Sequence, residues 1–180
     1  MLTYAEAVVV GVFQGVTELF PVSSLGHSVL VPALIGGQWA RDLNVSAPES
    51  PYLAFIVGLH VATAAALLLF FWRDWVAIVA GFISSVRYRR IDTLAERLAW
   101  LILLATPVIL AAGLLKIPDL FGPLGQGIGG QVLAGSIASF VSAYLAVRFL
   151  MRYFETRTLT PFAIYCTLAG LGSLVWLTIR

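Results

Sequence analysis

The strongest constraint on the fold is a set of apolar runs that carry no charged side chain. They cover residues 52–72, 98–115, 128–147 and 161–179. A helix needs about 20 mostly apolar residues to cross the hydrocarbon core of a bilayer. Each run is close to that length, so the sequence predicts an all-α integral membrane protein with about four transmembrane helices.

Composition agrees with this class. Of the 180 residues, 60% are hydrophobic and only 11% are charged, whereas soluble domains are about 25% charged. A chain of this length predicts a single membrane domain over residues 1–180. The 11 Lys and Arg residues are too few to indicate a nucleic-acid partner, and the one cysteine excludes an internal disulfide.

The N-terminal segment 4–35 is too long and too interrupted for one simple span. Pro21 lacks a backbone donor and clashes with the preceding helical turn, so it should break the helix. We therefore expect a re-entrant helical hairpin over residues 4–35. The shorter apolar stretch 75–86 predicts an interfacial or half-inserted helix.

Basic residues predict the orientation, because cytoplasmic loops of membrane proteins are enriched in Lys and Arg. The stretches 73–97 and 148–160 hold five and three arginines, whereas 36–51 and 116–127 hold one basic residue each. The first two stretches should be cytoplasmic and the other two external. The hairpin would then enter and leave from the outer face.

Polar side chains gather around the predicted helix break. The group consists of Gln14, Glu18, Ser23, Ser24 and His27, with Gly26 among them. Gln14 and Glu18 are four residues apart and share a helix face. The serines suit the N-cap of a second half-helix, whose free N–H groups would favour a phosphate.

A structural interpretation competes with a functional one. Serines often pack membrane helices together, and we interpret His60, alone in its apolar run, as a structural histidine. Ionisable groups inside a membrane are costly and usually functional. The density of polar groups around the break therefore favours a functional site there.

These residues carry a family resemblance. The stretch QGVTELFPVSSLGH, residues 14–27, resembles the first signature of the undecaprenyl-diphosphate phosphatase family, which is linked to bacitracin resistance. Residues 54–75 and 159–170 resemble later spans of that family. The resemblance implies hydrolysis of undecaprenyl diphosphate, a polyprenyl diphosphate lipid, to the monophosphate carrier used in peptidoglycan synthesis. It also implies a bacterial inner-membrane enzyme whose site faces the outer side.

The same resemblance assigns roles to the polar group. It implies that Glu18, Ser24 and His27 are catalytic, with the nucleophile left open between Ser24 and His27. It implies that Gln14, Ser23 and Gly26 bind substrate. A divalent cation, Mg or Ca, would be held by Glu18 and Gln14.

The sequence departs from the family in lacking its second signature motif. The second family signature, Pro-Gly-x-Ser-Arg-Ser, does not occur in the sequence. Residues 96–103 resemble the span before the family's internal loop and residues 104–122 the span after that signature, so we predict an internal deletion near Leu103. The deletion removes an arginine suited to clamp phosphate. The alternatives are a catalytically impaired lipid-binding remnant, a chain completed in a homo-oligomer, and a membrane lipid transporter.

Overall fold

The computed structural model describes residues 2–20, 22, 24–43, 51–105 and 127–179. These residues form α-helices, and none of them lies in a strand. The helices are α1 (Tyr4–Thr17), α2 (Ser24–Ile35), α3 (Gly37–Asp42), α4 (Pro51–Phe70), α5 (Trp72–Tyr88), α6 (Leu94–Ala105), α8 (Gly129–Phe154) and α9 (Thr160–Ile179). The predicted all-α class is confirmed for this part of the chain.

Helix α1 begins at a capping box. The Thr3 hydroxyl accepts a hydrogen bond from the Glu6 amide at 3.2 Å, and the Glu6 carboxylate accepts one from the Thr3 amide at 2.8 Å. This reciprocal pair satisfies two amides at the helix start. Helix α1 gives way at its C-cap, Glu18, and α2 begins at Ser24. The predicted break is confirmed, although Pro21 itself lies outside the described residues.

The centre of the fold is a close crossing of α1 and α8. A side chain at Gly11 would contact the Gly135 carbonyl, and one at Gly15 would contact the Ser139 carbonyl. Only glycine lets the two backbones approach this closely, as in the small-residue crossings of membrane helices. Phe55 of α4 also packs against Gly135, where an added Cβ would lie 2.6 Å from its ring.

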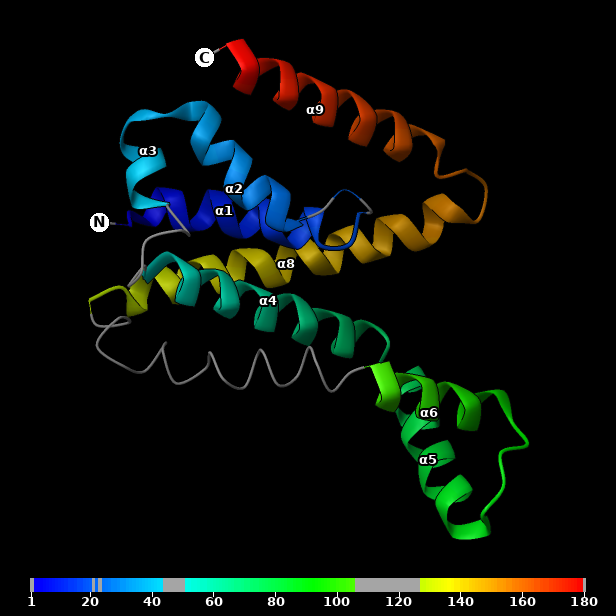
Figure 1. Cartoon of the computed structure of the whole chain (residues 1–180). Coiled ribbons are helices and arrows are strands. Elements are labelled where there is room, and N and C mark those ends of the chain that lie inside the picture. Colours follow the sequence, from blue (N-terminus) through cyan, green and yellow to red (C-terminus); the bar gives the residue numbers. More distant parts are fainter. Residues whose placement is uncertain (1, 21, 23, 44–50, 106–126, 180) are drawn as a thin grey trace.

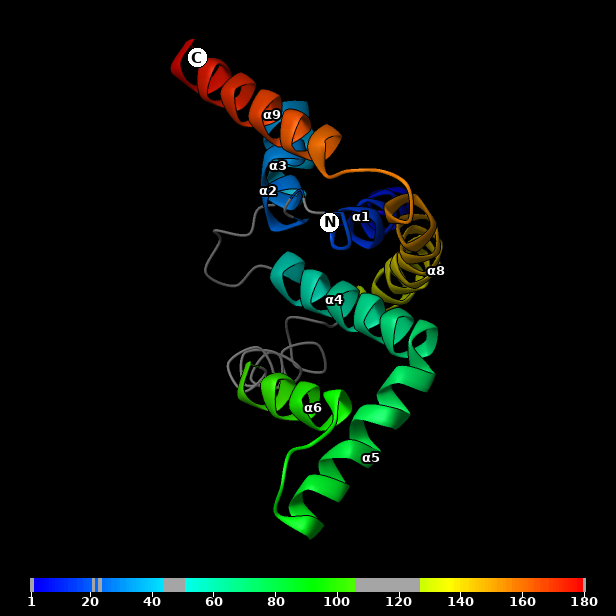
Figure 2. The ribbon, with the colours of Figure 1, turned by 90° about the vertical axis from the view of Figure 1, so that its right-hand side faces the viewer.

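Helices α1, α8 and α4 therefore form the central layer (Figure 1). Helices α2 and α9 lie on one side of it, and the α5–α6 hairpin projects from the far end of α4 (Figure 2). The buried core gathers between α1 and α4, around Ala7, Val10, Tyr52, Phe55 and Leu59.

Run 52–72 predicts one span, and α4 (Pro51–Phe70) matches it within two residues. The chain then turns by 84° into α5. Phe71 has a non-helical backbone, φ −97° and ψ 25°, and α5 is longer than the predicted helix 75–86. The run 128–147 predicts too early an end for α8, which continues to Phe154. Arginines end an apolar run without ending a helix.

The other two runs give different outcomes. Run 161–179 matches α9 within one residue. Run 98–115 overlaps α6, which begins four residues earlier, and its part after residue 105 lies outside the described residues. Among the described helices, α8 is long and apolar enough to cross a membrane alone, and the bent α4–α5 pair would be a second candidate.

The α5–α6 hairpin has its own polar contacts. Ser84 donates to the Glu96 carboxylate at 2.9 Å, and the Trp100 indole donates to Ser85 at 3.0 Å. The amides of Thr93 and Asp92 also donate to Glu96. These backbone donors, with the Ser84 hydroxyl, lower the pKa of Glu96 to about 2.

Candidate functional site

The site begins with the last turn of α1. Gln14 donates from Nε2 to Oε2 of Glu18 at 2.9 Å, so the predicted shared face is confirmed. Gln14 is 1% exposed, packed where α1 crosses α8. Glu18 lies one turn further, at the C-cap of α1. The carboxylate is therefore presented at the helix break, with a buried amide behind it.

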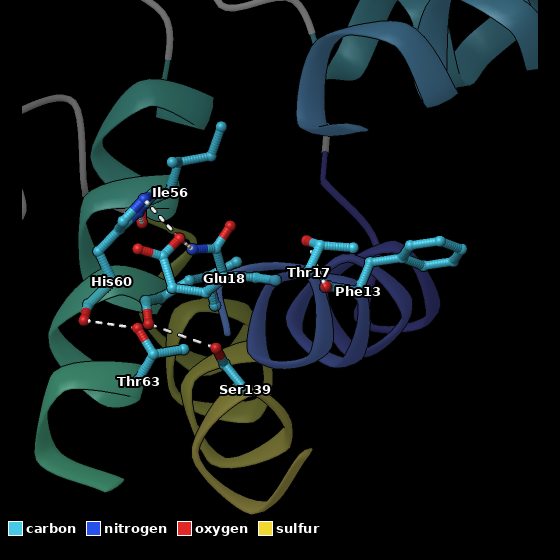
Figure 3. A network of polar contacts seen from close by, with 9 residues as sticks. Phe13, Thr17, Glu18, Ile56, His60, Thr63 and Ser139 are labelled. Carbon is cyan, nitrogen blue, oxygen red and sulfur yellow. Dashed lines mark hydrogen bonds and ion pairs between the residues drawn. The ribbon is translucent and has the colours of Figure 1, made fainter. Parts of the chain in front are cut away.

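Helix α4 adds a histidine to this pair. Nε2 of His60 lies 3.4 Å from Oε2 of Glu18, and Figure 3 shows the two side chains facing each other between α1 and α4. The other ring nitrogen, Nδ1, lies 2.9 Å from the Ile56 carbonyl oxygen. A carbonyl only accepts, so Nδ1 carries a proton and donates to it.

Two hydroxyl groups support the helix around His60. Thr63 donates to the His60 carbonyl at 2.8 Å. Ser139 of α8 donates to the Leu59 carbonyl at 3.3 Å, which ties α8 to α4 beside the imidazole. Both hydroxyls are buried. Contacts within α4 and from α8 therefore hold the backbone segment that carries His60.

One polar atom in the site has no partner. Oε1 of Gln14 is buried and accepts no hydrogen bond within the part of the chain that the structure describes. Leaving a buried acceptor unsatisfied costs about 1–3 kcal/mol. An amide oxygen next to a carboxylate suits Mg²⁺ or Ca²⁺, which prefer oxygen ligands. Across the described ranges, no three His, Cys, Asp or Glu residues gather as a metal cluster, so Gln14 and Glu18 could supply only part of a coordination sphere.

His27 of α2 lies in a different setting. Its Nε2 is 2.5 Å from the hydroxyl oxygen of Tyr165 on α9, and the two rings stack with centroids 5.8 Å apart. His27 and Tyr165 both line a cavity of about 360 Å³ between α1, α2 and α9, which Phe13 and Thr17 also line. Figure 3 shows Phe13 pointing away from Glu18. His27 therefore lies over another side of α1 than the Gln14–Glu18 pair.

Of the other predicted site residues, the structure gives only positions along the backbone. Ser24 begins α2 and Gly26 lies in its first turn, while Ser23 falls outside the described residues. The sequence analysis assigned His60 no functional role, yet the structure brings it to Glu18. The available signal was an ionisable side chain in the middle of an otherwise charge-free run.

Comparisons with known proteins agree with the motif. The family described as bacitracin resistance protein BacA matches residues 7–119 and 102–172. The undecaprenyl-diphosphatase of Mycobacterium avium is 48% identical over 301 aligned positions, covering 99% of each chain. Undecaprenyl-diphosphatase 2 of Frankia alni is 33% identical, covering 94% of this chain and 96% of its own. No solved structure gives a significant match.

The alignments also bear on the predicted deletion. The two matched segments overlap at residues 102–119, next to the predicted junction at Leu103. The 301 aligned positions of the Mycobacterium avium protein far exceed the 180 residues of this chain. A large internal part of that relative therefore faces a gap here.

Proposed function

Because this chain belongs to the bacitracin resistance protein BacA family, we propose that it hydrolyses undecaprenyl diphosphate to undecaprenyl phosphate and inorganic phosphate. This reaction regenerates the lipid carrier for cell-wall synthesis. The observation that carries the proposal is the Gln14–Glu18 pair at the end of α1, in a chain whose relatives include proteins named undecaprenyl-diphosphatase.

The reaction needs a nucleophile, a proton acceptor and donors for the phosphate oxygens. A bond forms between an attacking oxygen or nitrogen and the terminal phosphorus, and the bridging P–O bond breaks. Water finally supplies the hydroxyl of inorganic phosphate. The N-terminus of α2 follows the break and offers amide donors suited to the diphosphate. Glu18, one turn after Gln14, is suited to hold or move a proton. Because His27 in the first turn of α2 lies over another side of α1, the substrate would have to reach both the α2 start and Glu18.

Ser24 and His27 are the two candidates for attack or proton transfer. Ser24 begins α2 and His27 follows within its first turn, so both belong to the helix start that would bind phosphate. His27 also contacts the Tyr165 hydroxyl, which would fix its ring. Ser23 and Gly26 would line the path of the substrate phosphates.

A divalent cation, Mg or Ca, is part of the proposal. Gln14 Oε1 and the Glu18 carboxylate would hold it, because the amide oxygen is buried and has no hydrogen-bond partner among the described residues. Mg²⁺ is commonly bound by one or two protein oxygens, with waters and substrate phosphates completing its sphere. When bound, the cation would offset the charge of the diphosphate.

The proposed setting is the bacterial inner membrane. Residues 4–35 would form the re-entrant hairpin of a single membrane domain, and 52–72, 98–115, 128–147 and 161–179 would be its spans. Helix α4, with 20 residues, is about 30 Å long, which matches the bilayer core. The arginine-rich stretches would be cytoplasmic, so the site would face the outer side.

A second candidate is a lipid-diphosphate-binding remnant of low activity. The missing Pro-Gly-x-Ser-Arg-Ser signature favours it, because an arginine can bind phosphate through two parallel hydrogen bonds, which a lysine does not fully reproduce. A second copy in a homo-oligomer could supply the missing positive charge. Transport is a weaker alternative. Many transporters are built from two repeated halves that move against each other, and the segment missing here would belong to one of those halves.

Phosphate release from a polyprenyl diphosphate tests the proposal. The purified chain would be assayed beside the Mycobacterium avium relative, with Mg²⁺ and with a chelator. We expect phosphate release that requires the cation and is absent in Glu18→Gln. Tight lipid binding without release would instead support the remnant.

A further inference from the structure

We propose that His60 is a positioning residue that holds the carboxylate of Glu18 in its working orientation. The inference rests on the proposed phosphatase function, and it adds a residue of α4 to a site otherwise built from α1 and α2. It starts from one contact, the 3.4 Å approach of His60 Nε2 to Glu18 Oε2.

Glu18 lies where a contact from another helix can help to orient it. It is the C-cap of α1, and its side chain is 31% exposed. Gln14, one turn earlier, holds only Oε2. A second contact from another helix would restrict the carboxylate in a second direction.

His60 is itself fixed. Its Nδ1–H donates to the Ile56 carbonyl at 2.9 Å, so the ring orientation is set and Nε2 is aimed at Glu18. A bare Nε2 and a carboxylate oxygen both only accept, so the contact holds Glu18 when a proton lies between these two atoms. A hydrogen bond at one ring nitrogen commonly orients the other toward its functional partner. The carbonyls of Leu59 and His60 accept from Ser139 and Thr63, so the backbone carrying the ring is also held.

The two contacts meet at the same atom. Gln14 Nε2 and His60 Nε2 both approach Oε2 of Glu18. Replacing His60 would remove the contact that α4 makes with this oxygen, and with it one of the restraints on where the carboxylate lies. A misplacement of about 1 Å can cost about 100-fold in rate. We therefore expect His60 to act mainly on kcat, with little effect on KM.

The test compares His60→Leu, His60→Gln and His60→Asn in the purified full chain, with phosphate release from a polyprenyl diphosphate as the readout. Leucine removes both nitrogens. The Gln amide nitrogen can occupy the place of Nε2, whereas the Asn amide is one carbon shorter and reaches only the place of Nδ1. Asn is therefore the matched control for Gln. Thermal unfolding and elution volume establish that each variant is folded.

We expect kcat to fall about 10- to 100-fold in His60→Leu and His60→Asn, KM to change less than about threefold, and His60→Gln to recover most of the rate. If His60→Leu does not fold, the Gln–Asn pair alone decides the question. Equal rates for the parent and the Leu or Asn variant would overturn the positioning role, as would a Gln variant no better than Asn. A parent without activity beside an active relative would instead overturn the proposed function.

Discussion

Replacing Gly15 by alanine should separate α1 from α8 and disturb the site. A Cβ at Gly15 would contact the Ser139 carbonyl and the Ser142 hydroxyl. The hydroxyl can rotate away, but the carbonyl belongs to the backbone of α8. Overpacking of this kind costs about 1–3 kcal/mol. Alanine also gains up to about 1 kcal/mol of helix propensity over glycine, which partly hides the steric cost.

Gly172→Ala is the matched control. Gly172 lies in α9, and an added Cβ there meets nothing within 4 Å. Both substitutions gain a similar helix-propensity term, so the difference between them isolates the steric cost. Thermal unfolding of the purified proteins should place Gly15→Ala below Gly172→Ala by several degrees, since about 1 kcal/mol shifts Tm by about 2–4 °C at this size. Equal Tm values would refute the close crossing of α1 and α8.

The remaining predictions concern the site, the topology, the α5–α6 hairpin and the missing signature. Glu18→Gln should abolish phosphate release without reducing membrane insertion, and unchanged hydrolysis would make Glu18 structural. A reporter within residues 87–91 should be cytoplasmic and one within 122–130 external; reversed labelling would overturn the orientation. The lowered pKa of Glu96 means that its stabilising contribution is present above pH 4.5 and is lost as pH falls toward about 2, so Trp100 fluorescence should change over that range in the parent and not in Glu96→Gln. The turnover number should be about 10²–10³-fold lower than that of a full-length relative, and equal turnover would show that the deleted segment is dispensable.

Local chemistry made part of the site predictable. Gln14 and Glu18 are one helical turn apart, so their contact follows from helix geometry alone. Pro21 predicts a helix break, and the helix starting at Ser24 follows from the serines that suit an N-cap. These features depend on a few neighbouring residues, which a sequence displays directly.

The remaining features depend on tertiary packing. His60 reaches Glu18 because α4 and α1 both pack on α8, and α1 meets α8 closely only at its glycines. The turn at Phe71 lies at the end of the apolar run 52–72, but the sequence does not show its angle of 84°. The placement of His27 beside Tyr165 depends on how α9 returns to α2. None of these arrangements has a periodic signal in the sequence.

The most direct test of the central claim is phosphorus NMR of a polyprenyl diphosphate incubated with the purified chain and Mg²⁺. The incubation should be long enough to detect a rate about 10³-fold below that of the Mycobacterium avium relative. The account predicts that the diphosphate signals give way to equal amounts of lipid monophosphate and inorganic phosphate, and that Glu18→Gln leaves them unchanged. Intact diphosphate with the parent chain, beside full conversion by the relative, would contradict it.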